Sequence, residues 1–242
     1  MSGPPGPPEL PVEPGPRARA ALQAVLELLR DDPASLSSVI EPERGWRVHV
    51  ADSLTGLQVT ELASARRIAD IGAGAGFPGI VLAAALPDAR VDLIESVGRK
   101  CGFMRRALAV AEISNAEVVE DRSESWAAEG PPAGGAGSYE AVTARAVGRL
   151  STLAELASPL LAEGGVLVAW KGRRDPEEEA ELAAASARLA MEPLAVLSVG
   201  EQAGSKHRHL HPMRKIGPTP QDLPRRAGMA KKRPYGRGRS AD

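Results

Sequence analysis

Short apolar runs alternate along this chain with stretches in which apolar residues recur at helical spacing. Residues 17–30 predict an amphipathic helix, because apolar side chains return every three or four positions and Pro33 follows. The predicted strands are 68–71, 89–94, 116–119, 139–144, 166–170, 194–199 and 210–216, and the later helices are 80–86, 98–112, 150–162 and 177–190. This alternation predicts an α/β domain with a mainly parallel seven-stranded sheet, helices on both faces and an N-terminal helical extension.

Residues 70–79, Asp-Ile-Gly-Ala-Gly-Ala-Gly-Phe-Pro-Gly, connect the first predicted strand to a helix. Glycines permit positive φ and close approach of a ligand to the backbone, and the helix that follows presents unpaired N–H groups. The stretch therefore predicts a nucleotide-type binding loop. Gly74, Gly76 and Gly79 match the dinucleotide fingerprint, whereas Gly72, Gly74 and Gly76 match that of methyltransferases.

Polar residues at the ends of the next two predicted strands distinguish these ligands. Glu95 ends the second strand, where a carboxylate can accept hydrogen bonds from both ribose hydroxyls. Ser123 and Glu124 follow the third strand and can contact an adenine edge, while Asp70 can face a methionine moiety. A dinucleotide enzyme would also need a hydride-handling constellation further on, and the sequence shows none. The pattern favours S-adenosylmethionine as the cofactor.

Two further positions carry candidate chemistry. Arg145 ends the fourth predicted strand, which suits an anionic partner such as a ligand carboxylate or an RNA phosphate; pairing with a structural carboxylate is the alternative. Within residues 46–57, helical spacing places His49, Asp52 and Ser53 on one face. These three can line a site, or can equally be surface and capping residues.

Length and composition limit the organisation of the chain. With 242 residues, 43% hydrophobic and 25% charged, it can form one sizeable domain with tails. The predicted division is a disordered Pro/Gly-rich tail (1–16), a helical segment (17–60), a methyltransferase domain (61–217) and a basic C-terminal tail (218–242). The single cysteine, Cys101, excludes an intramolecular disulfide, and no apolar run is long enough to span a membrane. We expect a soluble cytoplasmic protein.

Charge is distributed unevenly along the chain. The formal net charge is −1, but residues 204–242 hold eleven cations and two acids, so the remainder carries −10. A polyanion would be attracted to this end of the molecule. A solvated basic tail that only aids solubility is the other interpretation.

Four motifs besides 70–79 make a more specific pattern: Ala-Arg-Ala at 144–146, Trp-Lys-Gly at 170–172, Arg-His-Leu at 208–210 and the basic run 225–234. In this order they resemble the RsmG family, also called GidB, of bacterial 16S ribosomal RNA methyltransferases. The resemblance implies a Rossmann-like class I S-adenosylmethionine-dependent methyltransferase fold. It also implies methylation at N7 of guanosine 527 in the 530 loop of 16S ribosomal RNA.

The resemblance extends to individual residues. Gly72, Phe77, the pair Ser123–Glu124 and Arg145 match cofactor-contacting positions, and His49, Asp52 and Ser53 match a His-x-x-Asp-Ser segment, which makes them the catalytic candidates. With the strand-end residues, the expected cofactor-binding set is Asp70, Gly72, Gly74, Phe77, Glu95, Ser123, Glu124 and Arg145. The expected RNA-binding set is Lys171, Arg208, Arg225, Arg226, Lys231, Lys232 and Arg233. No metal site is expected.

Two stretches depart from the family pattern. The Pro/Gly-rich loop 130–138 is longer than the family needs, and His211 and Pro212 interrupt the last predicted strand. A proline there predicts an edge position or a bulge.

The expected chemistry suits the residues present. Guanine N7 already carries an in-plane lone pair, so the reaction needs alignment rather than a general base. Methylation at cytosine C5 would require a cysteine nucleophile, and adenine N6 methylation usually brings an Asn-Pro-Pro-aromatic motif where residues 144–146 stand. Two alternatives stay open: a methyltransferase for a small molecule or a protein, and a non-enzymatic RNA-binding assembly factor. The expected partner is 16S ribosomal RNA or the small ribosomal subunit, with no membrane association, and the expected state is a monomer.

Overall fold

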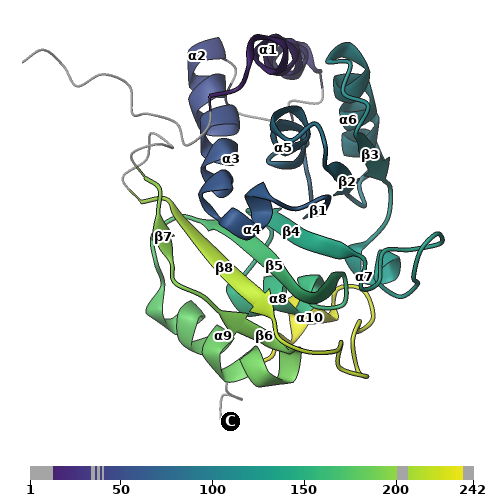
Figure 1. Cartoon of the computed structure of the whole chain (residues 1–242), viewed down its shortest axis with the longest axis vertical. Coiled ribbons are helices and arrows are strands. Elements are labelled where there is room, and N and C mark those ends of the chain that lie inside the picture. The colour runs from purple at the N-terminus through teal and green to yellow at the C-terminus, as the bar shows by residue number, and fades with distance from the viewer. Residues whose placement is uncertain (1–12, 34–35, 37–38, 40, 201–206, 237–242) are drawn as a thin grey trace, which may run out of the picture.

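A computed structural model describes residues 13–33, 36, 39, 41–200 and 207–236 (Figure 1). These residues form an eight-stranded sheet in the spatial order β3-β2-β1-β4-β5-β8-β6, with β7 paired to β8. The strands are β1 (Arg67–Ile71), β2 (Arg90–Ile94), β3 (Ala116–Val119), β4 (Tyr139–Arg145), β5 (Leu161–Lys171), β6 (Met191–Pro193), β7 (Leu197–Ser198) and β8 (His209–Lys215). Strands β1 to β5 are parallel, whereas β8 runs antiparallel to β5, β6 and β7. The mainly parallel sheet is confirmed.

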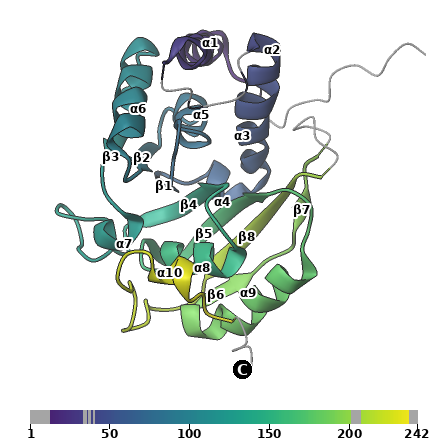
Figure 2. The same cartoon turned by 180° about the vertical axis from the view of Figure 1, so that it is seen from behind.

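Helices cover both faces of this sheet (Figures 1 and 2). On one face lie α1 (Pro16–Asp31), α2 (Pro42–Gly45), α3 (Asp52–Leu54), α5 (Gly79–Ala85) and α6 (Gly98–Val110). On the other lie α8 (Leu150–Ala157), α9 (Pro176–Leu189) and α10 (Met229–Lys232). The remaining helical segments are η1 (Trp46–Ala51), η2 (Thr55–Gln58), α4 (Thr60–Ala63) and α7 (Ser123–Trp126).

The strands are apolar at consecutive positions because both of their faces are buried. In β1, Ile68 belongs to the core under α1, α5 and α6, whereas Ala69 belongs to the core under α8 and α9. Val168 and Leu167 of β5 divide in the same way. Continuous apolar runs of this kind are typical of parallel strands covered by helices on both sides.

The predicted N-terminal helix is confirmed as α1. Its buried stripe of Leu22, Val25, Leu26 and Leu29 joins the core that α5 and α6 share. Residues 1–12 of the predicted disordered tail lie outside the described residues. No described helix is long and apolar enough to cross a membrane.

Two predictions about the last strands are wrong. Of the predicted strand 194–199 only 197–198 form a strand, β7, while β6 precedes it at 191–193, so the sheet has eight strands rather than seven. In addition, β8 lies inside the sheet without a bulge, although it contains Pro212. Pro212 O accepts from Leu194 N at 2.9 Å, so the Pro212 nitrogen, on the same side of the strand, faces the gap between β6 and β7. The missing N–H therefore removes no hydrogen bond between β8 and β5. It lies instead where β8 has no paired strand on its other side, between β6 and β7.

The described part of the predicted basic tail, 218–236, packs against the domain. Arg225 pairs with the buried Glu155 of α8, Thr152 Oγ1 donates to Ala230 O at 3.2 Å, and Tyr235 Oη donates to Asp222. This segment packs along the α8 side of the sheet (Figure 2). A charge count cannot reveal this, because the anchoring contacts come from residues distant in sequence.

A hydrogen-bond chain fixes α7 to the sheet, and the loop 130–138 is bonded to α7 through Gly135 N, which donates to Trp126 O at 2.8 Å. Trp126 Nε1 donates to Tyr139 Oη at 2.8 Å, and Tyr139 Oη donates to Asp92 Oδ2 at 2.8 Å. Gly135 lies so close that an added Cβ would be 2.3 Å from Trp126 Nε1. Burial beside Asp92 raises the pKa of Tyr139, so the phenol remains a donor.

We expect Tyr139→Phe to lower the free energy of unfolding by about 2 kcal/mol, because Trp126 and Asp92 would each lose a buried partner. The control is Tyr235→Phe, which removes a hydroxyl bonded to Asp222 at the surface and should cost less than about 0.5 kcal/mol. Urea denaturation measures both. Equal effects would contradict a structural role for the buried chain.

Candidate active site

The loop after β1 brings backbone N–H groups to the carboxyl edge of the sheet. Gly72, Gly74 and Gly76 have φ values of 63°, 64° and 91°, a region that other residues adopt only with strain. Gly74 N donates to Glu95 Oε2 at 3.1 Å, and an added Cβ on Gly74 would meet only Gly72 O, at 3.8 Å. The loop therefore leaves an open approach to its backbone beside the end of β2.

Asp70, in β1, stabilises this loop through buried hydrogen bonds. Its carboxylate is buried, and it accepts hydrogen bonds from Gly79 N at 2.9 Å and from Thr143 Oγ1 at 3.0 Å. Burial raises the pKa of Asp70 to about 7, against the opposing effect of these two bonds and of Arg145. One oxygen of Asp70 bonds to the start of α5 and the other to β4, and its predicted contact with a methionine moiety stays a prediction.

Glu95 also serves the loop. Its carboxylate is buried at the end of β2 and accepts from Gly74 N, from Val97 N at 3.0 Å and from Lys100 Nζ at 3.4 Å. A carboxylate has about four lone-pair sites, so Glu95 retains acceptor capacity beyond these bonds. The contact with ribose hydroxyls stays a prediction.

A cavity of about 210 Å³ lies at the carboxyl ends of β1, β2 and β3. It brings together four of the predicted cofactor-binding residues, Gly72, Glu95, Ser123 and Glu124. Asp121, after β3, lies beside them, and the other walls come from the β4–α8 region and from the C-terminal segment. These walls include Val147, Thr152, Leu156, Gly228, Ala230 and Lys231. We refer to this cavity as the donor pocket.

Three of these wall residues, Val147, Thr152 and Leu156, were missed by sequence reasoning, as were Gly228 and Ala230. Val147 follows Arg145 by two positions, and this proximity was the only available signal. The C-terminal wall gives no such signal, because the residues it faces precede it by about a hundred positions.

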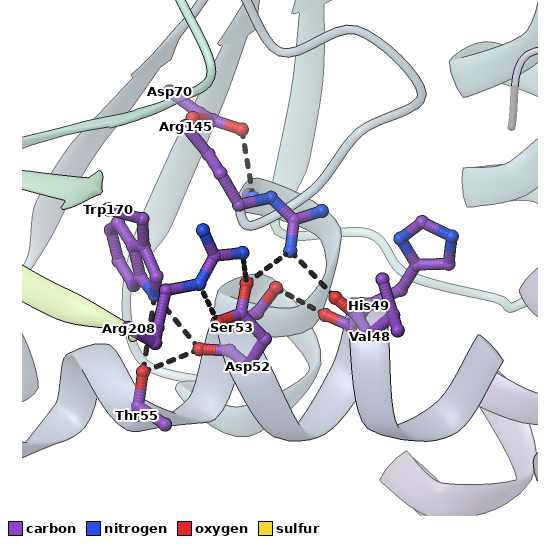
Figure 3. Close-up of polar contacts among 10 residues, drawn as sticks. Val48, His49, Asp52, Ser53, Thr55, Asp70, Arg145, Trp170 and Arg208 are labelled. Carbon is purple, nitrogen blue, oxygen red and sulfur yellow. Dashed lines mark hydrogen bonds and ion pairs between the residues drawn. The ribbon is translucent and has the colours of Figure 1, made fainter. Parts of the chain in front are cut away.

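A second cluster joins the end of β4 to the N-terminal helical segment (Figure 3). Asp52 is buried, and its carboxylate accepts from Arg145 Nη1 at 2.8 Å and, in a bidentate pair, from Arg208 Nε at 2.5 Å and Nη2 at 2.6 Å. Arg145 Nη1 also donates to Val48 O at 3.1 Å, and Trp170 Nε1 donates to Asp52 O at 2.9 Å. One carboxylate thus fixes two guanidinium groups.

The other catalytic candidates lie in this cluster. Ser53 Oγ donates to His49 O at 2.5 Å, and the His49 ring stacks on Phe77 with centroids 4.7 Å apart. The Arg145 guanidinium lies 5.7 Å from the Phe77 ring centre. The structure therefore brings together His49, Asp52 and Ser53 with the cofactor candidates Phe77 and Arg145. Because Asp52 and Ser53 use their side chains in contacts within the fold, both are suited to positioning rather than to proton transfer.

The predicted RNA-binding cations fall into two groups. Arg208 pairs with Asp52, Lys171 Nζ donates to Glu178 Oε1 at 2.6 Å and to Gly148 O, and Arg225 forms a bidentate pair with Glu155. These three are engaged in ion pairs within the fold, and their predicted role in RNA binding stays a prediction. The other four predicted RNA-binding cations, Arg226, Lys231, Lys232 and Arg233, are exposed at the surface.

The sheet order, with antiparallel β8 between β5 and β6, and the glycine loop at its carboxyl edge define the class I S-adenosylmethionine-dependent methyltransferase fold. A S-adenosylmethionine-dependent methyltransferase of Aquifex aeolicus superimposes with a TM-score of 0.54 at 16% identity, covering 76% of this chain and 99% of that chain. The fibrillarin pre-rRNA processing protein of Methanococcus jannaschii gives 0.54 at 16% identity, covering 69% and 74%.

Sequence comparison identifies the family. Residues 21–211 match the family described as GidB, rRNA small subunit methyltransferase G. The ribosomal RNA small subunit methyltransferase G of Rubrobacter xylanophilus is 42% identical over 208 residues, 83% of this chain and 77% of that protein. The protein of the same name from Desulfitobacterium hafniense is 34% identical over 204 residues, 84% and 83%. The chain belongs to this family and is a methyltransferase, which confirms the predicted resemblance.

The residues present fit S-adenosylmethionine, the cofactor of this fold and family. The glycine loop exposes its backbone next to a carboxylate at the end of β2, and the donor pocket lies beside both, where sheets of this type bind nucleosides. Among the described residues, no group of three His, Cys, Asp or Glu side chains could hold a metal ion.

We expect Gly74→Val to abolish donor binding, because the side chain would occupy the open approach to the loop backbone. Gly137→Val is the matched control, since Gly137 has a φ of 60° and no atom within 4 Å of an added Cβ, yet lies in the loop 130–138. Both substitutions impose similar backbone strain, so calorimetric titration with S-adenosylmethionine isolates the site. Equal affinities for the two variants would refute a ligand-contacting role for Gly74.

Burial, and secondarily Arg145, lowers the pKa of His49 to about 4, so the ring is neutral at physiological pH. Because the unfolded chain binds this proton near pH 6.5 and the folded one near 4, His49 should destabilise the fold as pH falls through this interval. The expected loss is up to about 3 kcal/mol. His49→Phe should remove that part of the pH dependence and retain the stacking on Phe77. Identical stability profiles for the two proteins at pH 4–7 would contradict the buried neutral ring.

Proposed function

We propose that this protein transfers the methyl group of S-adenosylmethionine to N7 of guanosine 527 in the 530 loop of 16S ribosomal RNA. The observation that carries the proposal is the family match over residues 21–211, together with relatives named ribosomal RNA small subunit methyltransferase G. The exposed cations beside the donor pocket support an RNA substrate.

The reaction requires the protein chiefly to align the donor methyl group with guanine N7. The bound donor supplies an electrophilic methyl group on a sulfonium centre. The N7 lone pair forms the new N–C bond as the S–C bond breaks, and the positive charge passes from sulfur to the methylated base. No proton has to leave N7 before attack, so the protein contributes chiefly orientation and exclusion of water.

The second cluster is suited to that task. We infer that Arg145 contacts the cofactor near the methionine end, next to Asp70 and Phe77, and that the stacked His49 and Phe77 rings form an apolar wall for the target base. Asp52 and Ser53 act as positioning residues, since Asp52 orients Arg145 and Ser53 bonds to the backbone of His49.

The substrate is expected to approach over the C-terminal segment, where exposed Arg226, Lys231, Lys232 and Arg233 can contact phosphates. Phosphate contacts supply affinity without sequence specificity, so the target base must be selected by RNA shape and extrusion into the crevice. Since one chain contains both the donor pocket and these cations, we propose a monomer that acts on ribosomal subunits in the cytoplasm.

The proposal is tested by incubating the protein with labelled donor and unmethylated small ribosomal subunits, naked 16S RNA, or mixtures of small molecules and proteins. The expected product is one methyl group at N7 of guanosine 527, located by RNA mass spectrometry. Methylation of another base, or only of a small molecule or protein, would overturn the proposal, as would absence of transfer to any substrate by a protein that binds donor.

We expect Asp52→Asn to reduce kcat/KM for RNA methylation by about 100-fold, because Arg145 and Arg208 would lose their common anion and shift by about an ångström. Asp92→Asn is the matched control: Asp92 is also buried and ion-paired, but it lies with Arg67 and Arg90 at the amino ends of β1 and β2. Thermal unfolding reports the stability of each variant separately. Equal losses of activity would rule out the positioning role of Asp52.

A further inference from the structure

The C-terminal segment forms part of the donor pocket. Gly228, Ala230 and Lys231 line the same cavity as Glu95 and Glu124. We propose that residues 223–235, here called the C-terminal strap, form a movable wall of the donor pocket, and that RNA bound to the strap holds the donor in place. The RNA part of this inference rests on the proposed function.

The strap contacts a predicted cofactor-binding residue directly. Gly228 N donates to Glu124 Oε1 at 2.7 Å, while Ser123 Oγ donates to the other oxygen, Glu124 Oε2, at 3.3 Å. The bond from Gly228 requires a φ of 81°, which glycine adopts without strain. The position of the strap and the geometry at the end of β3 are therefore linked through one carboxylate.

The two ends of the strap are anchored by side chains, whereas its middle is held by single hydrogen bonds and by buried Ala230. Near its start, Arg225 forms the bidentate pair with buried Glu155 and donates to Arg233 O at 2.8 Å. At its end, the Tyr235 ring lies 4.0 Å from the Arg225 guanidinium and 4.3 Å from that of Arg188. Between these anchors, the bonds from Gly228 to Glu124 and from Thr152 to Ala230 connect the strap to the pocket.

The size of the cavity supports a strap that moves when the donor binds. The donor pocket measures about 210 Å³, whereas pockets for ligands of this class usually enclose about 300–1,000 Å³. A donor that enters under the strap must displace its middle, and the strap then closes on the bound adenosine end. Donor release requires the same opening.

RNA can bind the closed strap, because the side chains of Arg226, Lys231, Lys232 and Arg233 are exposed while Gly228 is bonded to Glu124. Phosphates that neutralise these cations add free energy to the closed arrangement and oppose opening. Since such coupling is reciprocal, bound donor should also strengthen RNA binding by the same factor.

Substitutions at two glycines with similar φ values test whether the strap is a movable wall of the donor pocket. Gly228 and Gly164 have φ values of 81° and 82°, and an added Cβ would meet nothing within 4 Å at either position. Alanine therefore imposes the same strain at both, but only Gly228 lies in the strap. We expect S-adenosylmethionine to dissociate about fivefold faster from Gly228→Ala than from wild type, in stopped-flow displacement, and at an unchanged rate from Gly164→Ala.

The RNA coupling is tested with unmethylated small ribosomal subunits. They should slow donor dissociation from wild type about fivefold and should not slow it in Arg226→Ala/Lys232→Ala. The control is Arg17→Ala/Arg44→Ala, which removes the same number of exposed cations from α1 and α2 and should leave the slowing intact.

The outcomes separate this inference from the proposed function. Equal dissociation from the two glycine variants would overturn the movable wall, and an unchanged rate with subunits would overturn the coupling. A wild-type protein that binds no donor would overturn both the strap and the proposed function. Methylation at a position other than guanosine 527 would overturn the proposed function alone, since the glycine comparison does not depend on the substrate.

Discussion

The buried carboxylate of Asp52 is the interaction on which the arrangement of the active site depends. It pairs with Arg145 at the end of β4 and with Arg208 just before β8, residues that lie 93 and 156 positions further along the chain. A lone carboxylate at this depth would be destabilising by several kcal/mol, whereas one with two well-oriented guanidinium partners is compensated. The N-terminal helical segment is thereby fixed to the carboxyl edge of the sheet.

This constraint divides the site into two parts of different rigidity. The glycine loop, Asp70 and the Asp52 cluster connect elements of the central sheet, so they hold one geometry before any ligand binds. The strap crosses the other side of the crevice and contacts Glu124 through one backbone bond. A methyl transfer that depends on alignment benefits from the rigid part, and exchange of a cofactor after each reaction requires the adjustable part.

The sequence was informative where structure is local. The loop 70–79, the acids that end β1 and β2, and Arg145 at the end of β4 could be placed because the carboxyl ends of parallel strands meet at one edge. The sequence did not reveal which group pairs with each charged residue. Arg225 and Arg226 are adjacent and chemically identical, yet Arg225 pairs with buried Glu155 and Arg226 is exposed. The predicted edge position or bulge at Pro212 was wrong for a related reason. The effect of a proline in a sheet depends on which neighbouring strand its nitrogen faces.

Three of the predicted RNA-binding cations are paired with carboxylates of the fold, and four are exposed. Removing Lys171 or Arg225 would leave the largely buried Glu178 or Glu155 without its cationic partner, and removing Arg208 would leave buried Asp52 with Arg145 alone. An exposed phosphate contact would not offset that cost. These three cations therefore stabilise the fold through their ion pairs. The exposed cations of the strap are the ones to which the proposed function assigns phosphate contacts, and one of them, Lys231, also lines the donor pocket.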